Sequence, residues 1–220
     1  MSLLKFFVIF IYFFMQVASA EQQILGVGDF KIGMSLDEFR ELEIIKIGNY
    51  KFNEVLHSNY DAYDVHLYSI RAPLGIPNVD GKDEHNLNIS FYEGKLVSIY
   101  MLIHQIDIFK EILSAKYGTP RKKGKIGLVP CRYYFGGKGR ALEGAEEFIW
   151  GGNKEISAKI HDSWTQLGCD TRHYVSFTIE NSKSEQRMAE YIKKQKKQHD
   201  LNIAEESKRE RDRIKASSKL

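Results

Sequence analysis

Three consecutive residues of this 220-residue chain, His161, Asp162 and Ser163, are the side-chain types of a hydrolytic triad. They lie in a segment whose apolar residues alternate, which predicts a β-strand. Neighbouring side chains of a strand point to opposite faces, whereas the members of a triad must converge on one point. No G-x-S-x-G motif accompanies them. We therefore predict no catalytic residue here.

A second candidate is the glycine- and lysine-rich segment from Gly118 to Ile126. A phosphate-binding loop needs four residues between its glycines and a Ser or Thr after its lysine. This segment has five residues between Gly118 and Gly124, and Ile126 follows Lys125. An anion site shared between the basic groups 121–125 and 138–140 is also disfavoured, because a strand over 128–135 would separate them by roughly 26 Å. We expect solvated loops.

Cysteine chemistry offers three alternatives. Cys169 and His173 have a spacing that zinc sites use, and two cysteines can form a redox dithiol, but neither case shows C-x-x-C. The third alternative is a structural disulfide between Cys131 and Cys169, which suits an exported chain. We predict the disulfide, no metal and no cofactor.

The N-terminal twenty residues resemble a transport signal. Lys5 precedes an apolar run from Phe6 to Met15, and small residues stand at 18–20. This pattern predicts a signal peptide over 1–20, cut after Ala20, and a periplasmic or secreted protein. The alternative is a membrane anchor, but a spanning helix needs about 20 apolar residues.

Charge divides the remaining chain into two domains. Residues 183–220 carry twelve Lys and Arg against seven Asp and Glu, whereas residues 21–182 carry a net charge of −3. The tail lacks Gly and Pro and is rich in helix formers, so we predict a helix over 183–220 with Ser182 or Ser184 as its cap. A solvated helix is favoured over contact with anionic lipid or an acidic partner.

The body, residues 21–182, alternates between helical and strand patterns. Ser35 and Glu38 form a capping box at one helix start, and a second helix is predicted from Ile106 to Tyr117. In the rest of the body, segments in which apolar residues alternate with polar ones predict strands, and turn signals separate them. We predict an α+β fold, with antiparallel sheet and helices packed on one face, plus the long charged C-terminal helix.

The helix start Gly33-Met34-Ser35, with Glu38 three residues on, resembles that of the BamE/SmpA family of small periplasmic modules. The resemblance implies a helical N-terminus packed on a three-stranded antiparallel sheet, in a periplasmic binding module. This chain departs from the family by its length and by lacking the lipid-bearing cysteine.

A long connection from Arg71 to His85 is a candidate partner-binding loop. Leu74 and Ile76 lie between two prolines that restrict the backbone. These two side chains either face a partner or pack into the body, and the sequence favours neither alternative.

Composition excludes some classes of function. With 43% hydrophobic and 28% charged residues the chain is neither fibrous nor disordered, and a net charge of +3 does not indicate nucleic-acid binding. We expect an exported, soluble, non-enzymatic binding protein of unknown ligand, whose partner is a protein in the periplasm or envelope. The alternatives are an inhibitor or immunity-type protein, and a hydrolase whose residues the sequence does not reveal.

Overall fold

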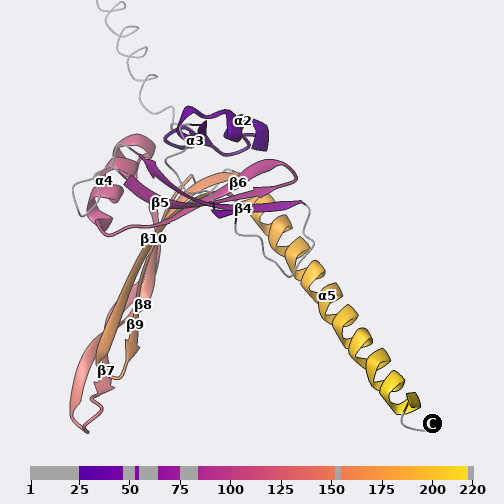
Figure 1. Ribbon diagram of the computed structural model, residues 1–220. Helices are drawn as coiled ribbons and strands as arrows, with labels where there is room; N and C mark the ends of the chain where they lie inside the picture. Colours follow the sequence, from indigo (N-terminus) through magenta and orange to yellow (C-terminus); the bar gives the residue numbers. More distant parts are fainter. Residues whose placement is uncertain (1–24, 47–52, 55–63, 75–83, 152–154, 218–220) are drawn as a thin grey trace, which may run out of the picture.

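The computed structural model describes residues 25–46, 53–54, 64–74, 84–151 and 155–217 (Figure 1). The predicted signal peptide lies outside these residues. In chain order the elements are β1 (Gly26–Val27), β2 (Phe30–Lys31), α2 (Leu36–Glu41), α3 (Glu43–Lys46), β3 (Asn53–Glu54), β4 (Val65–Pro73), β5 (Glu84–Tyr92), β6 (Lys95–Leu102), α4 (Ile106–Tyr117), β7 (Arg121–Arg132), β8 (Lys138–Trp150), β9 (Ile156–Leu167), β10 (Asp170–Asn181) and α5 (Ser182–Ser217).

One antiparallel sheet dominates the described residues. Its eight strands follow the order β3-β4-β5-β6-β10-β9-β8-β7, so β10 inserts between β6 and β9. Strands β1 and β2 form a separate small ribbon. The predicted mixed α+β class, with antiparallel sheet and a long C-terminal helix, is confirmed.

The main core gathers buried residues of the short helices and of the sheet. Phe39 of α2 and Phe109 of α4 are buried there, together with Ile89 of β5 and Ile99 of β6. A register shift between β5 and β6 lets Leu96 join the same core as Ile99, although the two residues differ in parity. An extra residue of this kind is a β-bulge, which changes the face to which later side chains point.

Both predicted body helices are present. Ser35 caps α2: its Oγ accepts from the Glu38 N–H at 3.1 Å, and the Ser35 N–H donates to the Glu38 carboxylate at 2.6 Å. The Ser35 hydrogen bonds hold the pKa of Glu38 below its ordinary value. Helix α4 ends at Gly118, whose φ of +81° suits glycine.

The start of helix α5 packs on a second, smaller hydrophobic cluster. Its Met188 is buried with Tyr92 and Val97, and Tyr191 and Ile192 pack against this smaller cluster. The N-cap is Asn181, whose Oδ1 accepts from the Ser184 N–H at 3.0 Å, so the predicted serine caps are wrong. Asn fits because its short amide reaches the third helical N–H. From Asp200 to Ile214 every side chain is exposed.

Strands β7 to β10 extend well past the body and form a long projection, which we call the arm (Figure 1). Each of these strands has 12 or 13 residues, about 40 Å of extended chain. The basic segment 121–125, expected as a solvated loop, is the start of β7 and pairs with β8. No helix within the described ranges is long and apolar enough to span a membrane.

The predicted partner loop 71–85 is shorter than expected, because its ends are strand: Pro73 pairs with Glu84. Leu74 is partly buried against the main core. Ile76 lies outside the described residues, so its role stays a prediction.

Candidate functional site: the tip of the arm

The disulfide predicted from the sequence stands near the end of the arm. Cys131 of β7 is bonded to Cys169 in the β9–β10 turn, with 5.2 Å between their Cα atoms. Pairing between β8 and β9 stops at Gly144 and Trp164, so beyond this point no strand pairing joins the β7–β8 hairpin to the β9–β10 hairpin. The disulfide ties the two hairpins together where the sheet no longer does.

Beyond the disulfide, the turn 133–137 closes the β7–β8 hairpin; we call this turn the tip. The Tyr133 N–H donates to the Gly137 carbonyl at 2.8 Å, and the Gly136 N–H donates to the Tyr133 carbonyl at 2.9 Å. Gly136 takes a φ of +95°, which glycine tolerates best. These bonds hold the backbone of a turn whose remaining side chains, Tyr134 and Phe135, are each 96% exposed.

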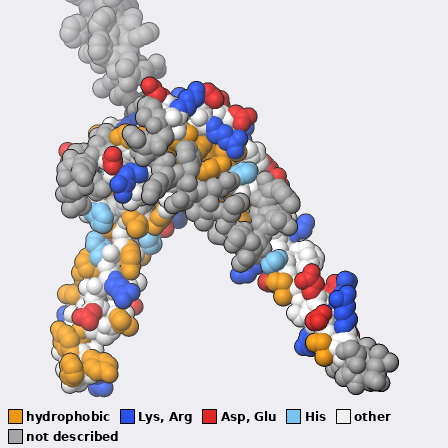
Figure 2. Space-filling view, in the orientation of Figure 1, with side chains coloured by type: hydrophobic (Ala, Val, Ile, Leu, Met, Phe, Trp, Pro, Cys, Tyr) orange, Lys and Arg blue, Asp and Glu red, His pale blue; other side chains and the backbone are white. Residues whose placement is uncertain are grey.

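The two outermost rings contact each other rather than the protein core. Tyr134 and Phe135 meet edge to face, with centroids 5.4 Å apart and planes at 87°. A pair of this kind is a favourable aromatic geometry, but it leaves nearly all the apolar area in water. Figure 2 shows the resulting concentration of hydrophobic side chains at the end of the arm.

The ring of Tyr133, which is 53% exposed, lies beside Gly139 next to the disulfide. A Cβ on Gly139 would lie 3.0 Å from the Tyr133 ring and 3.1 and 3.2 Å from the two sulfurs. These distances are tight for a methyl group, so a larger residue opposite Cys131 would require the ring or the disulfide to shift. The ring, the disulfide and Gly139 together make a close-packed base for the tip.

Apolar and basic side chains surround this base. Leu128, Leu167 and Tyr174 are between 49% and 70% exposed. Arg132 and Lys138 pair across the hairpin directly behind the tip, and Arg140 donates to the Leu128 carbonyl at 3.4 Å. Residues 128–142 include these three cations and no acidic residue. At the adjoining β9–β10 turn, the exposed Asp170 follows Cys169, and Arg172 is exposed two residues further on. The end of the arm is therefore apolar and carries more cations than anions.

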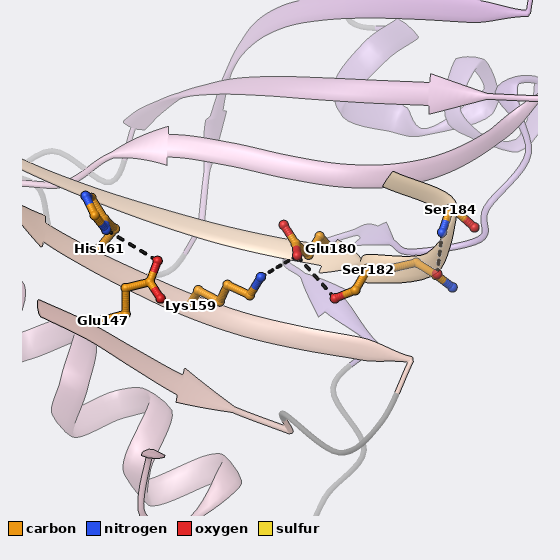
Figure 3. A network of polar contacts seen from close by, with 7 residues as sticks. Glu147, Lys159, His161, Glu180, Ser182 and Ser184 are labelled. Atoms are coloured by element: carbon orange, nitrogen blue, oxygen red, sulfur yellow. Dashed lines mark hydrogen bonds and ion pairs between the residues drawn. The ribbon is translucent and has the colours of Figure 1, made fainter. Parts of the chain in front are cut away.

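The three triad-type residues each have a separate partner. His161 pairs with Glu147 across the sheet at 3.5 Å, as Figure 3 shows. Asp162 contacts His173 at 2.8 Å on the other face, and Trp164 stacks on His173 with centroids 4.1 Å apart. Ser163 Oγ donates to the Tyr174 carbonyl at 3.4 Å. The structure does not bring the three together.

Residues that a phosphate loop or a zinc site would use are engaged in other contacts. Lys122 pairs with Glu146 at 2.8 Å inside a regular ladder, and this hydrogen bond lowers the pKa of Glu146. Cys169 is in the disulfide and His173 contacts Asp162, so neither is placed to join the other on a metal. Over the described residues, no group of three or more His, Cys, Asp or Glu is arranged to hold a metal ion.

A second polar cluster joins α5 to the sheet (Figure 3). Lys159 Nζ contacts Glu180 at 2.5 Å, and Ser182 Oγ donates to the same carboxylate at 3.2 Å. Glu185, in the first turn of α5, is half-buried, and one of its oxygens has no hydrogen-bond partner. These groups fix the start of the helix and form no pocket that we assign to a ligand.

Sequence reasoning missed the tip. The signal was present in Tyr133-Tyr134-Phe135-Gly136-Gly137, where two glycines follow three aromatic residues between strand-forming segments. No protein-family model, curated protein or solved structure matches the chain.

Proposed function

We propose that this protein is an exported, non-enzymatic binding protein that engages a target in the periplasm or envelope through the tip of its arm. The observation that carries the proposal is the pair Tyr134 and Phe135, both 96% exposed at the end of a disulfide-tied arm. Binding would remove the apolar area of these exposed rings from water. Aromatic residues contribute much of the binding free energy at interfaces.

The rigid base supports the same proposal. The disulfide, the Tyr133 ring and the bonded turn hold the tip in one shape before it meets a target. A preorganised surface loses little conformational entropy on binding. A disulfide also persists best in an oxidising compartment, which agrees with the export expected from residues 1–20.

An inhibitor or immunity-type role is the second candidate, because a projecting aromatic tip has the shape that can fill a concave site. The hydrolase alternative gains no support, since His161, Asp162 and Ser163 have separate partners. The resemblance to the BamE/SmpA helix start adds only the expectation of a periplasmic module.

Photo-crosslinking in the producing cell tests the proposal. A benzophenone side chain at position 134 should give a defined adduct, and Phe135→Ser in the same chain should reduce its yield at least fivefold. The matched control places the same group at Tyr100, which is also exposed but lies on the body. Equal labelling at both positions, or labelling of neither protein nor lipid at 134, would contradict a binding role for the tip.

A further inference from the structure

We infer that the target of the tip is the surface of an anionic lipid bilayer, into whose interfacial region Tyr134 and Phe135 insert. This inference rests on the proposed function and specifies its target. The sequence favoured a protein partner over a membrane surface, because the basic tail lacks the wide apolar face of a helix that lies on a membrane. The tip supplies the apolar group that the tail lacks.

The shape of the tip favours a bilayer. Tyr134 and Phe135 lie in the turn that ends the β7–β8 hairpin, and both side chains are almost fully exposed. A stable protein interface needs about 800 Å² from each partner, so a protein would have to enclose this end in a deep pocket. A bilayer encloses any convex apolar end without a preformed pocket. Tyr and other amphipathic rings concentrate at membrane interfaces.

The charges lie where lipid phosphates would be. Arg132 directly precedes the tip, Lys138 directly follows it, and Arg140 stands two residues further on. Neither Arg132 nor Lys138 has an ion pair within the part of the chain that the structure describes. Rings at the end and cations just behind them match the order of acyl chain and phosphate in an anionic leaflet.

Helix α5 extends to the same side of the body as the arm (Figure 1). Its outer part mixes exposed cations with exposed carboxylates, and Arg209 and Arg213 pair with Glu205 and Glu210. The proposal therefore rests on the tip and not on this helix.

Vesicle binding tests the inference with the exported form of the chain. We expect co-sedimentation with vesicles of phosphatidylcholine and phosphatidylglycerol at 7:3, and much weaker binding to pure phosphatidylcholine. In a Phe135→Trp variant, the anionic vesicles should shift the emission of the added tryptophan to shorter wavelength. Because each surface cation strengthens binding roughly fivefold, Arg132→Gln with Lys138→Gln should weaken it about 25-fold.

Removing the rings should weaken binding more than removing equivalent apolar groups elsewhere. Tyr134→Ser with Phe135→Ser should reduce the partition coefficient roughly tenfold or more. The control pair is Leu201→Ser with Ile203→Ser, which lie exposed on α5 and should leave binding nearly unchanged. Equal losses in both pairs, or no emission shift at position 135, would overturn the inference.

The two proposals fail separately. A defined protein adduct at position 134 without vesicle binding would overturn the bilayer target and leave a tip-mediated binding protein. If the tip variants lose neither the adduct nor vesicle binding, the tip is not a binding site and both proposals are wrong.

Discussion

Glu185 is the residue at which α5, β6 and β10 meet. Its carboxyl group is half-buried, Ser98 contributes a hydrogen bond, and the Glu180 carboxylate lies nearby. Burial raises the pKa of Glu185 above its ordinary value, and the Glu180 charge raises it further, while Ser98 and Lys159 oppose the rise. The folded protein therefore binds this proton more tightly than the unfolded chain does.

The direction of the pKa shift predicts the effect of pH. A carboxyl group with a raised pKa in the folded state costs stability above that pKa, and the cost disappears as the pH falls below the unfolded value. Glu185→Gln should therefore raise the free energy of unfolding at pH 7.5, by under about 1 kcal/mol because water screens a half-exposed group. At pH 3.5 the variant and the original chain should agree closely.

Urea denaturation at the two pH values measures this difference. The control is Glu206→Gln on the exposed part of α5, which should change little at either pH. A loss of stability in Glu185→Gln at pH 7.5 would contradict the argument.

At the scale of elements, the β7–β8 hairpin depends on two glycines in the middle of its ladder. Gly124 has a φ of +80° and Gly144 a φ of +119°. A Cβ added to Gly124 would lie 2.2 Å from the Ala145 carbonyl oxygen. A Cβ added to Gly144 would lie 2.3 Å from the Lys125 carbonyl oxygen. Glycine at such strand positions lets two backbones approach closely and bends the strand pair.

Gly144→Ala should therefore destabilise the protein by about 1–3 kcal/mol, because alanine resists a positive φ and its methyl group meets the facing backbone. Gly127→Ala, in the same hairpin, is the matched control, since a Cβ there meets nothing within 4 Å. Thermal denaturation of both variants makes the comparison. Equal melting temperatures would show that the hairpin does not need its glycine at 144.

The sequence predicted some elements better than others, for physical reasons. Strands with one buried face, such as Val175 to Ile179, alternate visibly and were found. The start of the edge strand β7 was missed because both of its faces meet solvent, so residues such as Arg121 to Lys125 show no alternation. The tip was missed because its position depends on the hairpin register, although the disulfide beside it was predicted correctly.

At the scale of the whole molecule, α5 divides into a docked start and a projecting remainder. Met188 is 5% exposed and belongs to the cluster with Tyr92 and Val97, whereas residues 200–214 are exposed throughout. Apolar burial contributes about 25 cal/mol per Å², so the outer part adds little to the stability of the body.

Deleting residues 196–220 should leave the melting temperature within about 2 °C of the full chain. Deleting residues 183–220 removes the buried Met188 as well and should cost about 2–5 kcal/mol. Differential scanning calorimetry of the two truncated chains measures how much the docked and the projecting parts of α5 each contribute to stability. A large fall in melting temperature on the shorter deletion would show that residues 196–220 pack on the body. The boundary between the docked and projecting parts of α5 would then be wrong.

The strand order has a consequence for how the chain acquires its structure. Leu102 of β6 pairs with Ser176 of β10, so β6 receives its second neighbour only after α4 and three further strands have been made. The hairpins of the arm close locally and quickly, whereas this pairing must close a long loop, which slows folding. Until β10 pairs with it, the edge of β6 lies open beside the apolar Ile99 and Met101. Newly synthesised chains are most prone to aggregate in that interval.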